Sequence, residues 1–236
     1  MPRFDFIAFD ADDTLWHNER IYHEAQTRFR DLVGRYCDPT TVLDRLYATE
    51  VRNLPDFGYG IKGFALSMIE TAIELSAGRI TAADVQSIIA IARDMLGAEV
   101  ELFENAGETV RALAKTHALM LVTKGDLYDQ ERKVARSGLR DCFRAVEVVS
   151  VKSPDSYRGL LSRHGVEAAR FMMVGDSLRS DVLPVLEIGA TAVYIPYSLV
   201  WAHEAAEAPP VGRSGFHQLS GIAELPSLVA RLESAG

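Results

Sequence analysis

The sequence has few cysteines, no long apolar run and no excess of positive charge. Its 236 residues include two cysteines, Cys37 and Cys142, whose separation matches no metal-binding pattern. We therefore expect both to be reduced thiols packed as small hydrophobic residues, as is usual in a cytoplasmic protein. No run of about eighteen apolar residues occurs, so we expect no transmembrane helix and no membrane partner.

The net charge of −8 argues against a broad nucleic-acid-binding surface, so no nucleic-acid partner is expected. A phosphorylated small molecule is compatible with it, because such a ligand requires only a local positive site. The first residues, Met-Pro-Arg, lack the successive basic, apolar and small-residue regions of a signal peptide, which also favours a cytoplasmic location. With 48% hydrophobic residues, the chain can bury a sizeable core.

Short apolar runs alternate with helical stretches over most of the chain. Runs rich in Val, Ile, Phe and Met predict strands buried on both faces of a sheet. These strands are Phe4–Asp10, Ala118–Thr123, Val146–Val149, Phe171–Gly175 and Thr191–Ile195. Helices are predicted over Gly107–Lys115, Leu127–Ser137, Pro154–His164, Asp181–Ile188 and Leu219–Leu232, and Ala202–Pro210 is predicted to be a surface connection. This alternation predicts an α/β fold with a doubly wound parallel sheet.

The interval 16–104 has no convincing strand. Apolar residues recur there at helical spacing, and Thr81 is a credible N-cap with an acidic residue in the first turn after it. An insert of roughly ninety residues with its own apolar faces is large enough to be a small domain. We therefore expect residues 1–15 and 105–236 to form an α/β core, and residues 16–104 to form a helical domain.

Two carboxylates follow the first predicted strand, in the run Phe9-Asp10-Ala11-Asp12-Asp13-Thr14. Side chains two residues apart in a strand project to the same face, which would bring Asp10 and Asp12 together at the carboxyl end, where α/β sheets bind ligands. Like charges so close are unfavourable unless a cation or a shared proton relieves them. Mg²⁺ prefers oxygen ligands and would do so. An Asp-rich turn is the purely structural alternative.

Three further signals fall at the carboxyl ends of predicted strands. Thr123 ends the second strand and Lys152 follows the third, while Gly175-Asp176, with Asp181 shortly after it, closes the fourth. Each alone has a structural explanation, such as a strand end, a solvated lysine or a helix cap. Their joint occurrence at one edge of the predicted sheet favours an active site.

This ordered set resembles the pattern of the haloacid dehalogenase (HAD) superfamily: Asp-x-Asp-x-Thr, a Thr or Ser, a Lys, then Gly-Asp-x-x-x-x-Asp. The resemblance covers the whole chain, and it implies a Rossmann-like HAD core with an inserted α-helical cap domain of the C1 type. Two positions depart from the pattern. Asp13 replaces a common glycine, and Asp tolerates the turn geometry required there. Lys124 replaces a common Asn or Gly, and we expect it to point to solvent.

The resemblance also implies roles. Asp10 would attack phosphorus and form an aspartyl-phosphate, and Asp12 would act as general acid and then general base. Thr123 and Lys152 would hold the phosphoryl oxygens in the transition state.

Mg²⁺ is the cofactor that the resemblance implies. Asp10, the backbone carbonyl of Asp12, and Asp176 would bind it, with Asp181 completing or orienting these ligands. The function implied is the hydrolysis of a small phosphomonoester, with a small phosphorylated metabolite as the partner. The physiological substrate remains open, as does the choice between monomer and homodimer.

Four alternatives remain. A phosphomutase would transfer the phosphoryl group to a sugar hydroxyl instead of water. A 2-haloacid dehalogenase of the same superfamily would use Asp10 but lacks the second carboxylate, so Asp12 disfavours it. An Asp-x-Asp glycosyltransferase would leave Lys152 and the Gly175-Asp176 pair unexplained. A non-catalytic phosphate-binding relative would not need the complete set.

The segment from Pro55 to Lys62 contains two glycines and a proline between two helical stretches, and it predicts a loop or a strained helix entry. We expect Tyr59 and Lys62 to recognise the non-phosphate part of the substrate. The structural alternative is an interhelical turn with Tyr59 packed and Lys62 solvated.

Overall fold

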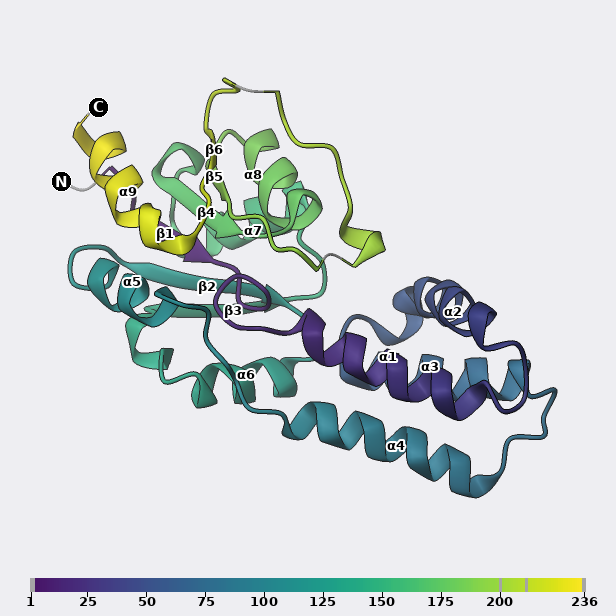
Figure 1. The fold of residues 1–236 in the computed structure, drawn as a ribbon. Coiled ribbons are helices and arrows are strands. Elements are labelled where there is room, and N and C mark those ends of the chain that lie inside the picture. The colour runs from purple at the N-terminus through teal and green to yellow at the C-terminus, as the bar shows by residue number, and fades with distance from the viewer. Residues whose placement is uncertain (1–2, 200, 211, 235–236) are drawn as a thin grey trace. The chain divides into compact units, whose positions relative to one another are not determined.

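The computed structural model describes residues 3–199, 201–210 and 212–234. In these residues one sheet of parallel strands has the order β3-β2-β1-β4-β5-β6, as Figure 1 shows. The strands are β1 (Phe6–Phe9), β2 (Leu119–Lys124), β3 (Ala145–Val149), β4 (Phe171–Gly175), β5 (Thr191–Tyr194) and β6 (Phe216–Gln218). The order reverses at β1, from which the chain winds outward in both directions. The predicted doubly wound α/β fold is confirmed.

Helices cover both faces of the sheet, so successive side chains of β1 enter different cores. Ile7 and Phe9 pack with residues of α5 (Ala106–Leu113), α6 (Leu127–Arg136) and α9 (Leu225–Ser234). Phe6 and Ala8 pack with residues of α7 (Pro154–His164) and α8 (Leu183–Glu187). Burial on two faces explains why β1 reads as a continuous apolar run.

The helix ends that were predicted from glycine residues are confirmed. Gly138, Gly165 and Gly189 have φ angles of 68°, 64° and 81°, in the left-handed region that ends a helix. Two helix starts were wrong. The predicted helix Asp181–Ile188 begins earlier, as a π-helical turn over Leu178–Val182 that precedes α8. The last helix begins at Leu225, after strand β6 and a short 3₁₀ turn.

Strand β6 was not predicted. Its three residues, Phe216-His217-Gln218, are too few and too polar to give the apolar run by which the other strands were found.

A second unit is helical and has its own core. It contains α1 (Glu19–Val33), α2 (Val42–Phe57), α3 (Ile61–Leu75) and α4 (Ala82–Gly97). All four helices contribute fully or largely buried apolar side chains to this core, including Phe29, Leu46, Met68 and Ile88. Thr81 is the predicted N-cap of α4 and forms a capping box with Asp84.

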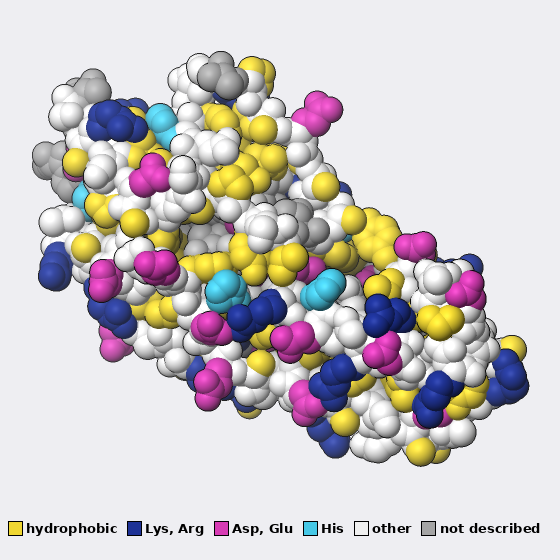
Figure 2. All heavy atoms as spheres, viewed as in Figure 1, with side chains coloured by type: hydrophobic (Ala, Val, Ile, Leu, Met, Phe, Trp, Pro, Cys, Tyr) yellow, Lys and Arg dark blue, Asp and Glu magenta, His cyan; other side chains and the backbone are white. Residues whose placement is uncertain are grey.

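Residues 1–17, 100–124 and 130–236 form one compact unit, and residues 18–99 and 125–129 form the other. The boundaries 16 and 104 remain a prediction about domains, because compactness alone does not show independent folding. Cys37 and Cys142 are free, and each packs at the edge of an apolar core, as expected. Lys and Arg are interspersed with Asp and Glu over the face of the helical unit in Figure 2. No helix in the described parts of the chain is long and apolar enough to cross a membrane.

Candidate active site

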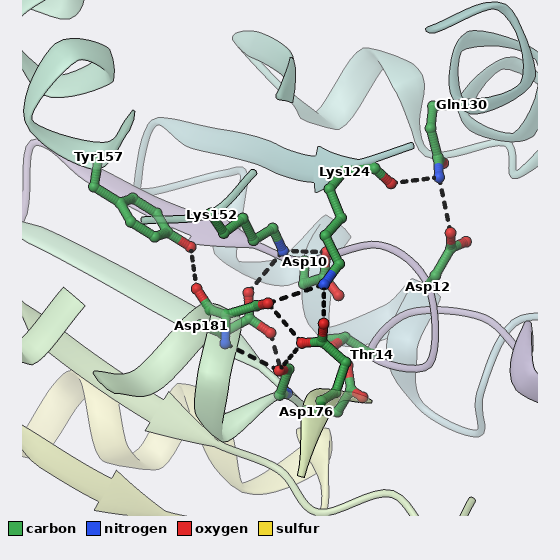
Figure 3. Close-up of polar contacts among 12 residues, drawn as sticks. Asp10, Asp12, Thr14, Lys124, Gln130, Lys152, Tyr157, Asp176 and Asp181 are labelled. Atoms are coloured by element: carbon green, nitrogen blue, oxygen red, sulfur yellow. Dashed lines mark hydrogen bonds and ion pairs between the residues drawn. The ribbon is translucent and has the colours of Figure 1, made fainter. Parts of the chain in front are cut away.

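A lysine and two carboxylates form the buried centre of the site. Asp10 directly follows β1, and Lys152 lies between β3 and α7. The Lys152 Nζ atom donates to Asp10 Oδ1 at 2.5 Å and to Asp181 Oδ1 at 2.7 Å. Asp181 is 0% exposed, and Lys152 is 5% exposed. The predicted edge of the sheet therefore does bring these three residues together, as Figure 3 shows.

Gly175 allows the carboxylate of Asp181 to approach the end of β4. A Cβ atom at position 175 would lie 2.3 Å from Asp181 Cγ, so any other residue there would force Asp181 to move. The backbone N–H of Ser177 donates to Asp181 Oδ2 at 3.1 Å. The π-helical turn over Leu178–Val182 carries Asp181 into this position. The Gly-Asp-x-x-x-x-Asp spacing is thus a packing requirement as well as a chemical one.

Asp176 completes an acidic group. Its Oδ1 atom accepts from the Thr14 hydroxyl at 2.7 Å. Asp10, Asp176 and Asp181 each offer a carboxylate oxygen, and these oxygens all lie within 4.8 Å of one another. The Lys152 ammonium pairs with two of these three carboxylates, so with all three ionised the negative charge of the group would exceed its positive charge. Carboxylate oxygens in this number and proximity are suited to a hard divalent cation such as Mg²⁺.

The pKa values reflect this imbalance. Burial raises the pKa of Asp10 to about 7, although the Lys152 ammonium opposes the rise. Burial, followed by the charges of Asp10 and Asp181, holds the pKa of Asp176 well above its usual range. Burial lowers the pKa of Lys152, but the Asp10 and Asp181 carboxylates raise it more, so it stays charged. A bound cation would reduce the electrostatic repulsion among the carboxylates.

Asp12 turns to different partners from Asp10. It accepts from Trp16 Nε1 at 2.7 Å, from Gln130 Nε2 at 2.8 Å and from Lys133 Nζ at 2.7 Å. Figure 3 shows its carboxylate directed toward Gln130 and away from Asp10. The expected alternation of strand side chains does not reach Asp12, because β1 ends at Phe9.

The donors of Asp12 also set its protonation. Burial raises the pKa of Asp12, but the Lys133 ammonium and the hydrogen bonds from Lys133, Gln130 and Trp16 lower it more. Asp12 is therefore a carboxylate at neutral pH in this arrangement. Sequence reasoning missed all three donors. Gln130 and Lys133 lie at (i, i+3) spacing on α6, which places them on one helix face, but nothing in the sequence indicates what that face meets.

The expectation that Lys124 points to solvent is wrong. Its side chain is 19% exposed, and its ammonium pairs with the Glu204 carboxylate. Lys124 also donates to Ser180 Oγ at 3.0 Å. The hydroxyls of Ser177 and Ser180 each donate to Glu204 Oε2 at 2.6 Å. The predicted surface connection Ala202–Pro210 is therefore wrong at Glu204, whose side chain is 13% exposed.

Two other predicted features can be located. Thr123 is 1% exposed and stands next to last in β2, at the same edge of the sheet as Asp10. Asp13 has a φ angle of 61°, the turn geometry expected of it. Thr14 belongs to the Asp-x-Asp-x-Thr pattern, but its hydrogen bond to Asp176 was not predicted. The sequence pattern does indicate that a hydroxyl belongs at that position.

The predicted loop from Pro55 to Lys62 is shorter than expected. Helix α2 continues through Pro55 to Phe57, and α3 begins at Ile61. Between them Gly58 and Gly60 have φ angles of 68° and 119°, which explains both glycines. Lys62 Nζ pairs with Asp126 Oδ1 at 2.9 Å in the same unit, and its side chain is 56% exposed. Tyr59 is partly buried.

Comparison with solved structures shows two relatives of the same fold at low identity. A 2-haloacid dehalogenase from Pseudomonas syringae is 23% identical, with a TM-score of 0.65 over 97% of this chain and 99% of that chain. A predicted phosphoglycolate phosphatase from Haemophilus somnus is 15% identical, with a TM-score of 0.62 over 97% and 99%. The fold therefore does not choose between the two reactions.

A third structure is far more similar. It is a haloacid dehalogenase-like family hydrolase from Xanthomonas campestris, 41% identical, with a TM-score of 0.89 over 99% of this chain and 93% of that chain. None of the curated proteins compared with the sequence matches it. The family model of haloacid dehalogenase-like hydrolases matches residues 4–189. With most of the chain matched, this protein belongs to the haloacid dehalogenase-like hydrolases and is an enzyme of that family.

Proposed function

We propose that this hydrolase is a Mg²⁺-dependent phosphatase that cleaves a small phosphomonoester through an aspartyl-phosphate. The observation that carries the proposal is Asp12, a second, partly buried carboxylate two residues after Asp10 that three side-chain donors hold in place. An alcohol leaving from phosphorus needs a proton, whereas a halide leaving from carbon needs none. A dehalogenase would have no use for this arrangement.

In the first half of the reaction, a carboxylate oxygen of Asp10 forms a bond to phosphorus while the bond to the ester oxygen breaks. The Lys152 ammonium, 2.5 Å from Asp10 Oδ1, favours the ionised nucleophile. Thr123 and Lys152 would hold the phosphoryl oxygens as their charge shifts. Asp12 takes up a proton from solvent when the substrate binds and gives it to the leaving oxygen. A bound dianionic phosphate next to Asp12 would raise its pKa, because like charges favour the protonated form.

In the second half, Asp12 is again a carboxylate, the form that its Lys133 partner favours. It takes a proton from water as the water oxygen bonds to phosphorus and the bond to Asp10 breaks. The sum is ester plus water giving alcohol plus inorganic phosphate. Asp10 and Asp12 are both returned to their starting states.

Asp10, Asp176 and Asp181 fit a divalent cation by their donor chemistry and mutual distances, and the backbone carbonyl of Asp12 would be a further ligand. When bound, Mg²⁺ would offset the charge that develops on the phosphoryl oxygens. Tyr59 and Lys62 are included in the proposal as residues that recognise the leaving group. We expect their effects to be confined to substrates larger than the phosphoryl group itself.

A direct assay tests the proposal. Purified protein is given para-nitrophenyl phosphate or 2-chloropropionate, with MgCl₂ or with EDTA, and the release of para-nitrophenol or chloride is measured. We expect para-nitrophenol release that requires Mg²⁺ and no chloride release. Chloride release without phosphatase activity would instead identify a dehalogenase and would exclude the role given to Asp12.

A further inference from the structure

We propose that Lys124, Ser177 and Ser180 form an anion subsite beside the phosphoryl site. Glu204 occupies this subsite in the free enzyme, and an acidic group of the substrate displaces it. The proposal deepens the proposed phosphatase function and rests on it for the identity of the substrate. The subsite would select a phosphomonoester of a small hydroxy acid, whose carboxylate would replace that of Glu204.

The three donors converge on one carboxylate. The Lys124 ammonium and the hydroxyls of Ser177 and Ser180 all contact Glu204, with both Ser–Glu distances at 2.6 Å. One ammonium and two hydroxyls form a complete set of partners for a carboxylate, by charge and by hydrogen bonding. The contacts of Glu204 thus indicate that this anion subsite accepts a carboxylate. Figure 3 places the Lys124 amino group in the same close-up as Asp10 and Lys152.

The residues of the anion subsite are next in sequence to residues of the proposed reaction centre. Lys124 follows Thr123, the proposed phosphate ligand, and Ser177 follows Asp176. Ser180 precedes Asp181. Each donor is thus the sequence neighbour of a residue proposed to hold phosphate or metal. A group bound here would belong to the same small molecule as the phosphoryl group.

Glu204 differs from its partners in where it comes from. Lys124 ends β2 and the two serines come shortly after β4, whereas Glu204 ends a three-residue 3₁₀ helix, Ala202–Glu204. In the described residues between β5 and β6, this is the one regular element. Besides the contacts of Glu204, the backbone oxygen of His203 accepts from Arg179 Nη1 at 2.5 Å. A segment with so few regular backbone hydrogen bonds is cheaper to displace than a strand or helix of the core.

The kinetic test compares two substrates that differ in one group. These are 2-phosphoglycolate, which carries a carboxylate, and 2-hydroxyethyl phosphate, which carries a hydroxyl. The readout is the ratio of their kcat/KM values. In Glu204→Gln the competing carboxylate is gone, so the ratio should rise about ten-fold, the effect of one charge-assisted contact. In Lys124→Met the ratio should fall by about the same factor, and the double variant should resemble Lys124→Met. Glu207→Gln, an exposed change in the same segment, is the control.

A binding test does not depend on catalysis. The rings of Trp201 and His203 lie with their centroids 4.8 Å apart and are tilted by 44°, so Trp201 fluorescence should report on the segment that carries Glu204. Glycolate, which has no phosphate, should produce a saturable change in the wild-type protein. The change should be absent from Trp201→Phe and Lys124→Met, and half-saturation should occur at lower glycolate in Glu204→Gln.

The outcomes separate the two proposals. If para-nitrophenyl phosphate is not hydrolysed but glycolate binds as described, the phosphatase assignment fails and the anion subsite stands. If the phosphatase is active but the ratio of kcat/KM values in Glu204→Gln stays within about two-fold of wild type, Glu204 serves only to anchor the segment between β5 and β6. That result, or glycolate binding unchanged in Lys124→Met, would overturn the subsite.

Discussion

Two largely buried charge clusters lie at the same edge of the sheet and differ in the balance of positive and negative charge. In the first, the carboxylates of Asp10, Asp176 and Asp181 lie together, and the Lys152 ammonium pairs with Asp10 and Asp181. In the second, one ammonium faces one carboxylate, Lys124 and Glu204, and serine hydroxyls donate to the carboxylate. With every carboxylate ionised the first cluster would have an excess of negative charge, whereas the second is neutral and its carboxylate is hydrogen-bonded through both oxygens.

The pKa shifts follow from this difference. Burial raises the pKa of Asp176 well above its usual range, and neighbouring carboxylates add to the rise. Burial also acts to raise the pKa of Glu204, but the Lys124 ammonium and the hydrogen bonds lower it to about 2. Burial alone therefore does not decide whether a carboxyl is ionised. The first cluster gains from an added cation, and the second gains nothing from one.

The largest effect is expected at the nucleophile. Asp10→Asn removes one negative charge from the first cluster and leaves an amide that cannot form an aspartyl-phosphate. Activity toward para-nitrophenyl phosphate should fall by at least ~10⁴-fold, the scale seen when a nucleophile is removed. Asp155→Asn is the control, because its side chain is 93% exposed. Thermal unfolding of both variants should show an intact fold, and near-wild-type turnover in Asp10→Asn would disprove its role.

Asp12→Ala should slow the reaction by about 10²–10⁴-fold, the usual contribution of general acid–base catalysis. The loss should be smallest for esters with good leaving groups, which need little help from a proton. Rates for a series of aryl and alkyl phosphates measure this dependence. Asp12→Asn serves as a second variant, because it keeps a side chain of the same size among Trp16, Gln130 and Lys133. An equal loss across the series would argue against proton donation.

Much of the fold was predictable because its signals are local. Strands buried on both faces gave continuous apolar runs, and the helix ends at Gly138, Gly165 and Gly189 gave left-handed stops. Short or polar elements such as β6 carried no such signal. The π-helical turn before α8 was also missed, because it depends on how Asp181 packs against Gly175.

The centre of the site was predictable for another reason. Asp10, Lys152 and Asp176 each follow a strand, and parallel topology brings strand ends together. The partners of Asp12 and Lys124 were not predictable, because they depend on contacts between segments far apart in the chain. Glu204 lies eighty residues from Lys124. Its surroundings in sequence, rich in Ala, Glu and Pro, indicate only an exposed connection.

Lys152→Met sharpens the contrast between the clusters, because it removes the ammonium that pairs with Asp10 and Asp181 in the first one. Breaking a buried ion pair from one side typically costs about 3–5 kcal/mol, and here the remaining carboxylates also repel one another. Urea unfolding without divalent cations should show a loss of this size. MgCl₂ should restore part of the stability, and it should bind more tightly than to wild type. Lys115→Met, at an exposed lysine, should lose little under either condition. Equal losses in both variants would show that Lys152 does not balance the cluster.

The smallest effect is expected in the second cluster, and it depends on pH. The pKa of Glu204 in the folded protein is about 2, below its ordinary value of 4.5, so its ionised form stabilises the fold above pH 4.5. That stabilisation is at most about 3 kcal/mol, and it disappears as the pH falls from 4.5 through 2. The decrease in unfolding free energy caused by Glu204→Gln should therefore reach its full size at pH 6 and be about 2 kcal/mol smaller at pH 3. Urea titrations at both pH values measure it, with Glu207→Gln expected to show no such trend. A loss that is the same at pH 3 and pH 6 would mean that the charge of Glu204 contributes nothing, and that the second cluster is held by its hydroxyls alone.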